Sequence, residues 1–251
     1  MGKGSIEMKP KVIILRASGT NCDLETRSAF DFVGARTELV HINELLNGAK
    51  KLVDYDIMAI PGGFSFGDDI SAGKIFALRI KKLKSDFNDF IKAKKPLIGI
   101  CNGFQVLVKT GFLPYDIELK QRATLYSNDV GHFICRWVKV RINKNSPCIF
   151  TKGLPNEFYL PIAHGEGKFI STRSVISDLR KKNLDALLYL ENPNGSYSDI
   201  AGVTNNSGNV FGLMPHPERV FFSLQQPWKN KGILAIGYEF FKNAVNYARG
   251  L

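Results

Sequence analysis

The chain has 251 residues, of which 44% are hydrophobic, and its formal net charge is +11. This length can bury a full core within one domain, and no apolar run approaches the roughly 20 residues that span a bilayer. The N-terminus lacks the apolar segment of a signal peptide, and the four cysteines show neither metal-binding nor disulfide spacing. We therefore expect a cytoplasmic protein, with residues 1–10 as an N-terminal extension and residues 11–251 as a single domain.

The excess of positive charge at first suggests a nucleic-acid partner. Many of the lysines, however, lie between residues 74 and 95, where they alternate with Ile, Leu and Phe at helical spacing. This pattern is typical of an amphipathic helix whose lysines face solvent. We therefore predict one long helix over about residues 74–94, and no nucleic-acid partner.

The first hundred residues alternate between strand-like and helix-like segments. Thr20 and Asp23 have the spacing of a helix capping box, and an apolar helical stripe follows them. Such alternation indicates an α/β fold with a mostly parallel sheet and helices on both faces. Short apolar runs predict the strands at residues 11–15, 37–42, 55–60 and 97–100.

The pattern changes beyond residue 111. Turn-forming sequences at residues 192–195 and 205–208 separate short strand-like runs, as in antiparallel hairpins. We therefore expect antiparallel strands added to the sheet in the C-terminal half, and a closing amphipathic helix over residues 233–248. The added strands are predicted at residues 134–142, 184–190, 200–204 and 210–214.

The fourth predicted strand runs directly into a Gly-x-Cys-x-Gly sequence formed by Gly99, Cys101 and Gly103. This is the cysteine form of a nucleophile elbow, a sharp turn from a strand into a helix. The turn would raise the thiol to the carboxyl edge of the sheet, at a helix N-terminus that favours the thiolate. The alternative is a buried structural cysteine. We predict that Cys101 is a nucleophile.

The strand before the long helix ends in Pro61-Gly62-Gly63, which would lie beside the elbow. Glycines let backbone N–H groups approach a ligand closely. One of these N–H groups, with that of Asn102, could form an oxyanion hole. The alternative is an ordinary glycine turn. The chain has no G-x-G-x-x-G fingerprint of a dinucleotide site.

A cysteine nucleophile needs a base, and the chain has four histidines. His216 stands between two prolines, which impose an extended backbone and place Glu218 on the same side of the chain. Glu218 could then orient the His216 ring and stabilise its charged form. His132 and His164 lie in glycine-rich loops and remain alternatives, whereas His41 lies in a predicted strand and is expected to be structural.

The Gly-Ile-Cys-Asn-Gly-Phe-Gln and Pro-His-Pro-Glu sequences, in this order, resemble those of the class I (triad) glutamine amidotransferases. The resemblance extends from about Lys11 to the C-terminus. Further stretches are similar to the branch of this family that supplies ammonia for the amination of formylglycinamide ribonucleotide in purine biosynthesis. These stretches are residues 19–26, 61–68, 133–138, 161–167, 194–196 with 200–202, and 212–219.

The resemblance implies a flavodoxin-like fold and a triad of Cys101, His216 and Glu218. It also implies that glutamine is hydrolysed through a glutamyl thioester and that ammonia passes to a separate synthetase subunit. That partner would use ATP and Mg²⁺, while this chain would need neither a cofactor nor a metal. The resemblance leaves open whether a third small subunit joins the complex.

By family position, the backbone N–H groups of Gly63 and Asn102 would form the oxyanion hole. The chain has His132 where the family usually has arginine, and Phe66 where tyrosine is common. The residues expected to contact glutamine are Gly62, Phe64, Gln105, His132 and Phe133.

Two alternatives to this function remain. One is a different cysteine hydrolase or stress protein with a similar sheet, although such proteins usually place their histidine elsewhere. The other is a non-enzymatic regulatory subunit, which would have no need of an intact triad.

Overall fold

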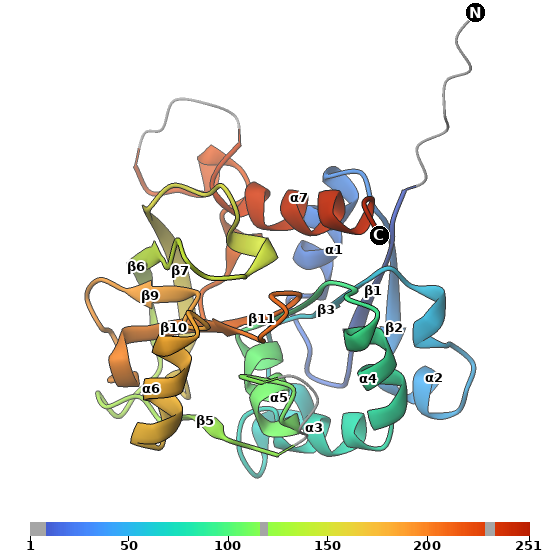
Figure 1. Cartoon of the computed structure of the whole chain (residues 1–251), viewed down its shortest axis with the longest axis horizontal. Helices are drawn as coiled ribbons and strands as arrows, with labels where there is room; N and C mark the ends of the chain where they lie inside the picture. The colour runs from blue at the N-terminus through green and yellow to red at the C-terminus, as the bar shows by residue number, and fades with distance from the viewer. Residues whose placement is uncertain (1–8, 116–119, 229–233) are drawn as a thin grey trace, which may run out of the picture.

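The computed structural model describes residues 9–115, 120–228 and 234–251, so most of the expected extension at residues 1–10 lies outside it. A nine-stranded sheet in the order β2-β1-β3-β4-β11-β10-β9-β6-β7 forms its centre (Figure 1). Its strands are β1 (Lys11–Arg16), β2 (Arg36–His41), β3 (Ile57–Ile60), β4 (Leu97–Ile100), β6 (Ile134–Ile142), β7 (Glu157–His164), β9 (Leu187–Tyr189), β10 (Ile200–Thr204) and β11 (Val210–Leu213). A separate antiparallel pair joins β5 (Ala123–Tyr126) and β8 (Lys168–Ser171).

The sheet has a parallel half and an antiparallel half, as the sequence predicts, but β11, predicted among the added antiparallel strands, pairs parallel with β4 and antiparallel only with β10. Strands β2, β1, β3, β4 and β11 run parallel to one another, and β10, β9, β6 and β7 continue the sheet in antiparallel pairs. Every residue of β3 and β4 is buried, as expected for central parallel strands covered on both faces. The last residues of β7 alternate between buried and partly exposed, because one of its faces is less covered.

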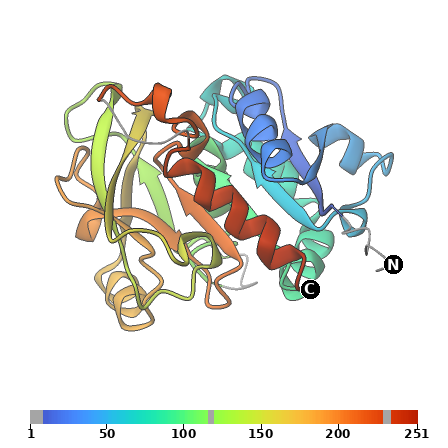
Figure 2. The ribbon, with the colours of Figure 1, turned by 90° about the horizontal axis from the view of Figure 1, so that it is seen from above.

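Helices cover both faces of the parallel half. In Figure 1, α1 (Asp23–Phe32) and α7 (Gly237–Ala248) lie above the sheet, and α3 (Lys74–Lys81), α4 (Lys84–Lys92) and α5 (Asn102–Thr110) lie below it. Figure 2 shows α7 running diagonally between the parallel and antiparallel halves. The two remaining helices are α2 (Ile42–Leu46) and α6 (Arg173–Lys181). Within the described ranges, no helix has the length and apolar character needed to cross a membrane.

Three predictions of local structure are wrong. The single helix predicted over residues 74–94 is two helices, because Leu83 N–H bonds to Ile80 O in a tight turn that separates α3 from α4. The predicted capping box is absent from the start of α1, since Thr20 Oγ1 instead accepts a hydrogen bond from Ala17 N. Helix α7 begins at Gly237, and the start predicted for it lies partly outside the described residues.

Candidate active site

The predicted elbow is present between β4 and α5. Cys101 has φ 52° and ψ −102°, a strained conformation for a residue with a side chain. A Cβ on Gly103 would lie 1.9 Å from Ile60 O, and one on Gly99 would lie 2.6 Å from Leu107 Cδ1. Both glycines are therefore needed for α5 to pack this closely on β3 and β4. Cys101 N–H donates to Leu213 O at 2.8 Å, which ties the elbow to the end of β11.

The glycine loop after β3 lies beside the elbow, as predicted. Gly63 has φ 144°, and a Cβ there would meet Asn21 N and Gly19 O at 2.7 Å. A Cβ on Gly62 would lie 3.5 Å from Cys101 Cβ. The loop therefore fits only as glycine at Gly63, and it brings the backbone next to the thiol.

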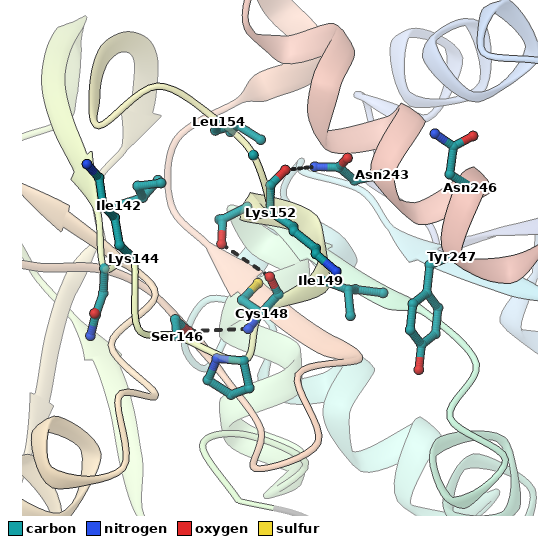
Figure 3. A pocket seen from close by; sticks show the side chains of 14 residues that line it. Ile142, Lys144, Ser146, Cys148, Ile149, Lys152, Leu154, Asn243, Asn246 and Tyr247 are labelled. Carbon is teal, nitrogen blue, oxygen red and sulfur yellow. Dashed lines mark hydrogen bonds between the residues drawn. The ribbon is translucent and has the colours of Figure 1, made fainter. Parts of the chain in front are cut away.

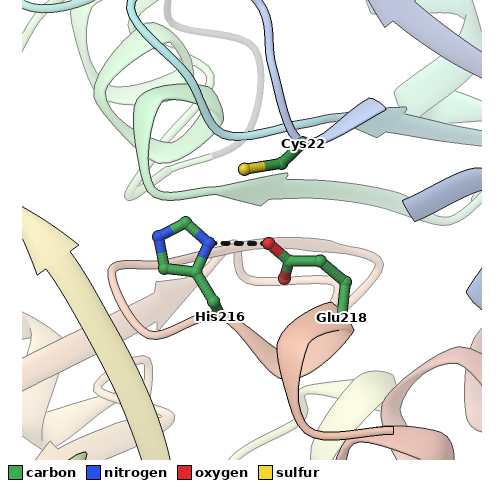
Figure 4. Close-up of side chains that lie close together, drawn as sticks. All are labelled: Cys22, His216 and Glu218. Atoms are coloured by element: carbon green, nitrogen blue, oxygen red, sulfur yellow. Dashed lines mark hydrogen bonds and ion pairs between the residues drawn. The ribbon is translucent and has the colours of Figure 1, made fainter. Parts of the chain in front are cut away.

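His216 and Glu218 form a buried pair just after β11. Their side chains are almost fully buried, and His216 Nδ1 lies 2.6 Å from Glu218 Oε1 (Figure 4). The predicted contact between these two residues is therefore confirmed. The predicted extended backbone is wrong from Pro217 onward, because Pro217–Arg219 form a short 3-10 helix whose first position accepts proline. His216 N–H donates to Pro161 O at 2.9 Å, so the backbone before the ring is anchored on β7.

The electrostatic environment of His216 favours its charged form. Burial is the largest single effect and lowers the pKa of His216, but the Glu218 carboxylate together with the nearby Cys101 and Cys22 side chains outweighs it and raises that pKa well above its usual value. His216 Nε2 has no hydrogen-bond partner among the described residues. The Cys101 thiol instead points to Ala163 O at 3.7 Å. Contacts between a nucleophile and its base are often loose in the free enzyme and tighten with substrate.

The other three histidines lie in different environments. His164 is buried, and burial together with the charge of His216 lowers its pKa to about 4, so it is neutral near pH 7. Its Nδ1 bonds to Asn128 Oδ1 at 3.1 Å. His132 is exposed, with Nδ1 near Val130 O. His41 accepts a hydrogen bond from Asn43 N at the start of α2, which confirms its structural role.

The residues expected to hold glutamine fall into two groups. Phe64 and Phe133 are each 48% exposed, and their rings lie 6.4 Å apart. Gln105 is buried, and its amide is already engaged, because it accepts from Asn102 Nδ2 at 2.9 Å and donates to Glu166 O at 2.6 Å. The two aromatic rings can therefore face a ligand directly, whereas Gln105 supports the loops around the thiol.

A network of charged side chains around the buried Lys109 joins these loops, and the sequence analysis missed it. Lys109 of α5 donates to Ala72 O at 2.5 Å and lies 3.9 Å from Glu166 Oε2. Burial lowers the pKa of Lys109 and raises that of Asp68, whose carboxylate accepts from Asn102 Nδ2. Their spacing in the sequence gives no sign that these groups meet, because they come from separate loops and a helix.

Cys22 is a second thiol beside the pair, and sequence analysis assigned it no role. One ligand atom each from Cys22, His216 and Glu218 lie within 4.8 Å of one another (Figure 4). The 2.6 Å between His216 Nδ1 and Glu218 Oε1 is a hydrogen-bond distance. Two ligands of one tetrahedral zinc would lie roughly 3.3 Å apart. The arrangement therefore fits an acid–base pair better than a metal centre.

A large cavity lies at the opposite edge of the sheet. Its volume is about 770 Å³, and it is bounded by the end of β6, residues 143–154 and α7 (Figure 3). Ile149, which lines the cavity, donates its N–H to Gly208 O at 3.0 Å. Gly208 precedes β11, so the cavity is at the amino end of the parallel strands. Cys101 lies at their carboxyl end, where open α/β sheets bind ligands. The cavity is therefore separate from the site around Cys101.

Known proteins resemble the chain over nearly its whole length. The family model of CobB/CobQ-like glutamine amidotransferase domains matches residues 9–248. Phosphoribosylformylglycinamidine synthase subunit PurQ of Dehalococcoides mccartyi is 45% identical, with 96% of this chain and 98% of that protein covered. The PurQ subunit of Methanococcus maripaludis is 40% identical at the same coverage. Among solved structures, PurLQS from Thermotoga maritima matches with a TM-score of 0.78 and 32% identity, covering 96% of this chain and 99% of the other.

Proposed function

Because the chain belongs to the PurQ family of glutamine amidotransferases, we propose that it hydrolyses glutamine at Cys101 and delivers the ammonia to a synthetase subunit. Its function is that of the glutaminase subunit of phosphoribosylformylglycinamidine synthase, in purine biosynthesis. The observation that carries the assignment of residues is the buried His216–Glu218 pair beside a strained elbow cysteine.

The first half of the reaction forms a thioester. The Cys101 thiol gives its proton to neutral His216 at Nε2, which forms a thiolate and a charged ring, and the sulfur then attacks the side-chain amide carbon of glutamine. The developing oxyanion accepts hydrogen bonds from the N–H groups of Gly63 and Asn102. When the C–N bond breaks, His216 returns the proton to the leaving nitrogen, and ammonia departs.

The second half releases glutamate. Water attacks the thioester while His216 takes one of its protons, and the C–S bond breaks to restore Cys101. Glu218 keeps Nδ1 of the ring protonated and stabilises the imidazolium that forms in both halves, which agrees with the raised pKa of His216.

Docking of the synthetase subunit would complete the site. Phe64 follows Gly63 directly, and its exposed ring packs beside that of Phe133 at the edge of the glycine loop. A partner that covers these rings would also fix the orientation of the Gly63 peptide. This should raise kcat more than it lowers KM. In this scheme the partner alone uses ATP and Mg²⁺, and this chain contributes neither a cofactor nor a metal.

The test compares the chain alone with its complex with the synthetase subunit and nucleotide substrates. Glutamine turnover should rise by at least about tenfold in the complex, which corresponds to about 1.4 kcal/mol of barrier. Cys101→Ala should abolish glutamine-dependent amination but leave amination from added ammonia intact. Cys148→Ala, which removes another buried cysteine, should leave both reactions unchanged. Loss of the ammonia-dependent reaction in Cys101→Ala would refute a glutaminase role separate from the synthetase.

A further inference from the structure

Cys22 lies beside the His216–Glu218 pair, and the mechanism above does not use it. Its side chain is buried, with 1% exposure, and Figure 4 shows its sulfur over the His216–Glu218 pair. Arg219 Nη2 donates to Cys22 Sγ at 2.9 Å. Arg219 Nε also lies 3.9 Å from Glu218 Oε1. One guanidinium group therefore bridges the thiol and the carboxylate.

The backbone around Cys22 holds the glycine loop. The N–H groups of Asn21 and Cys22 both donate to Gly62 O, at 3.3 and 3.2 Å. Thr20 forms an isolated antiparallel bridge with Gly63. Residues 19–22 thus contact both parts of the site that must be aligned. Their backbone bonds to the glycine loop, and the Cys22 side chain contacts the His216–Glu218 pair.

We propose that residues 19–22 and Arg219 form a brace that aligns the glycine loop with the His216–Glu218 pair, with Cys22 as a positioning residue. The inference deepens the proposed glutaminase function and rests on it. It also gives a physical role to the Gly-Thr-Asn-Cys-Asp stretch, which the proposed mechanism leaves without one.

The geometry of Glu218 explains why a brace is needed. Its Oε1 accepts from His216, whereas its Oε2 is buried without a hydrogen-bond partner among the described residues. A carboxylate held by one hydrogen bond can turn about its side-chain torsions unless packing prevents it. The rigid guanidinium of Arg219 and the bulky sulfur of Cys22 restrict that movement on one side. Removing the sulfur would leave Arg219 Nη2 without this acceptor and open space beside the ring.

The first measurement compares Cys22→Ala and Cys22→Ser in the complex with the synthetase subunit. We expect Cys22→Ala to lower kcat for glutamine about tenfold with KM within about threefold, since a small misplacement acts on the chemical step. Serine keeps an acceptor for Arg219, so Cys22→Ser should recover part of the loss. Cys148→Ala is the matched control, because Cys148 is also buried but lies by the remote cavity, and it should keep the wild-type kcat.

Two further readouts separate positioning from loss of folded protein. The double variant Cys22→Ala/Arg219→Gln should be no slower than the slower single variant, because both changes break the same brace. The alkaline limb of kcat/KM should also move to lower pH, since a loosened Glu218 holds the charged ring less firmly. The titratable groups around that ring are Glu218, Cys22, Cys101 and His164, with Arg219 next to them. Loss of folded protein would lower the apparent kcat but leave the alkaline limb of kcat/KM at its wild-type pH.

The outcomes distinguish this inference from the proposed function. If Cys22→Ala keeps the wild-type kcat and pH profile while Cys101→Ala is inactive with glutamine, the brace is wrong and the glutaminase assignment stands. Strictly additive losses in the double variant would also overturn the brace. If a glutamine-like alkylator modifies Cys22 instead of Cys101, Cys22 is a nucleophile and both conclusions fail.

Discussion

An alanine at Gly62 tests how strongly the reaction rate depends on the position of the His216 ring. A Cβ there would lie 2.9 Å from His216 Cε1 and 3.3 Å from Cys22 Sγ. The first contact is about 0.5 Å shorter than an ordinary one, so in Gly62→Ala the imidazole must shift by that amount. A misplacement of 1 Å can cost roughly a hundredfold in rate, so we expect a loss of about tenfold in kcat, or about 1.4 kcal/mol.

The assay is steady-state glutaminase activity of the complex, with thermal unfolding of each variant measured in parallel. Gly62 does not have a positive φ, so alanine fits its backbone and Tm should change little. Gly250→Ala is the matched control, because its φ is not positive either and its Cβ would meet only Tyr247 O, at 3.5 Å. A folded Gly62→Ala variant with wild-type kcat would refute the idea that the position of the ring limits the reaction.

Three further predictions concern the nucleophile, the acid–base pair and the elbow. A glutamine-like alkylator should label Cys101 in preference to the exposed Cys135, as peptide mass mapping would show, and equal labelling would contradict the assignment. Glu218→Gln should lower kcat about a hundredfold, less than His216→Ala does, and move the alkaline limb of kcat/KM to lower pH, because the carboxylate raises the pKa of the ring; an unmoved limb would contradict this. Gly103→Ala should lower the free energy of unfolding by about 3 kcal/mol in urea titrations, because its Cβ would lie 1.9 Å from a carbonyl oxygen of β3, and an unchanged midpoint would show that α5 can move away from the sheet.

The sequence was most informative where local rules determine the structure. The glycines at 99 and 103 predict the elbow, because only glycine lets a helix pack this closely on the preceding strands. The β-branched and aromatic residues from 134 to 142 predict β6 with its observed bounds. The prolines around His216 keep Glu218 two residues away and at hydrogen-bond distance, although Pro217–Arg219 form a short 3-10 helix and not the predicted extended course. In each case the sequence pattern that carries the prediction lies within a short stretch of the chain.

Features that depend on distant contacts were not predicted. Cys22 follows β1 and the His216–Glu218 pair follows β11, so they meet only because these two parallel strands of the sheet end at the same edge. The spacing of Thr20 and Asp23 suggested a local cap instead, yet Thr20 pairs with Gly63 across the sheet edge. Thr20 therefore pairs with a distant loop and does not cap α1.

The choice among the histidines shows what a structure adds to a sequence motif. His164 and His216 are both buried, and burial by itself lowers the pKa of an imidazole. At His164 the ring bonds to a neutral amide, and the positive charge of His216 lowers its pKa further. At His216 the Glu218 carboxylate, together with the side chains of Cys101 and Cys22, more than offsets burial. The carboxylate partner, rather than burial or loop composition, thus determines which histidine can carry a proton near neutral pH, and so which one can serve the thiol.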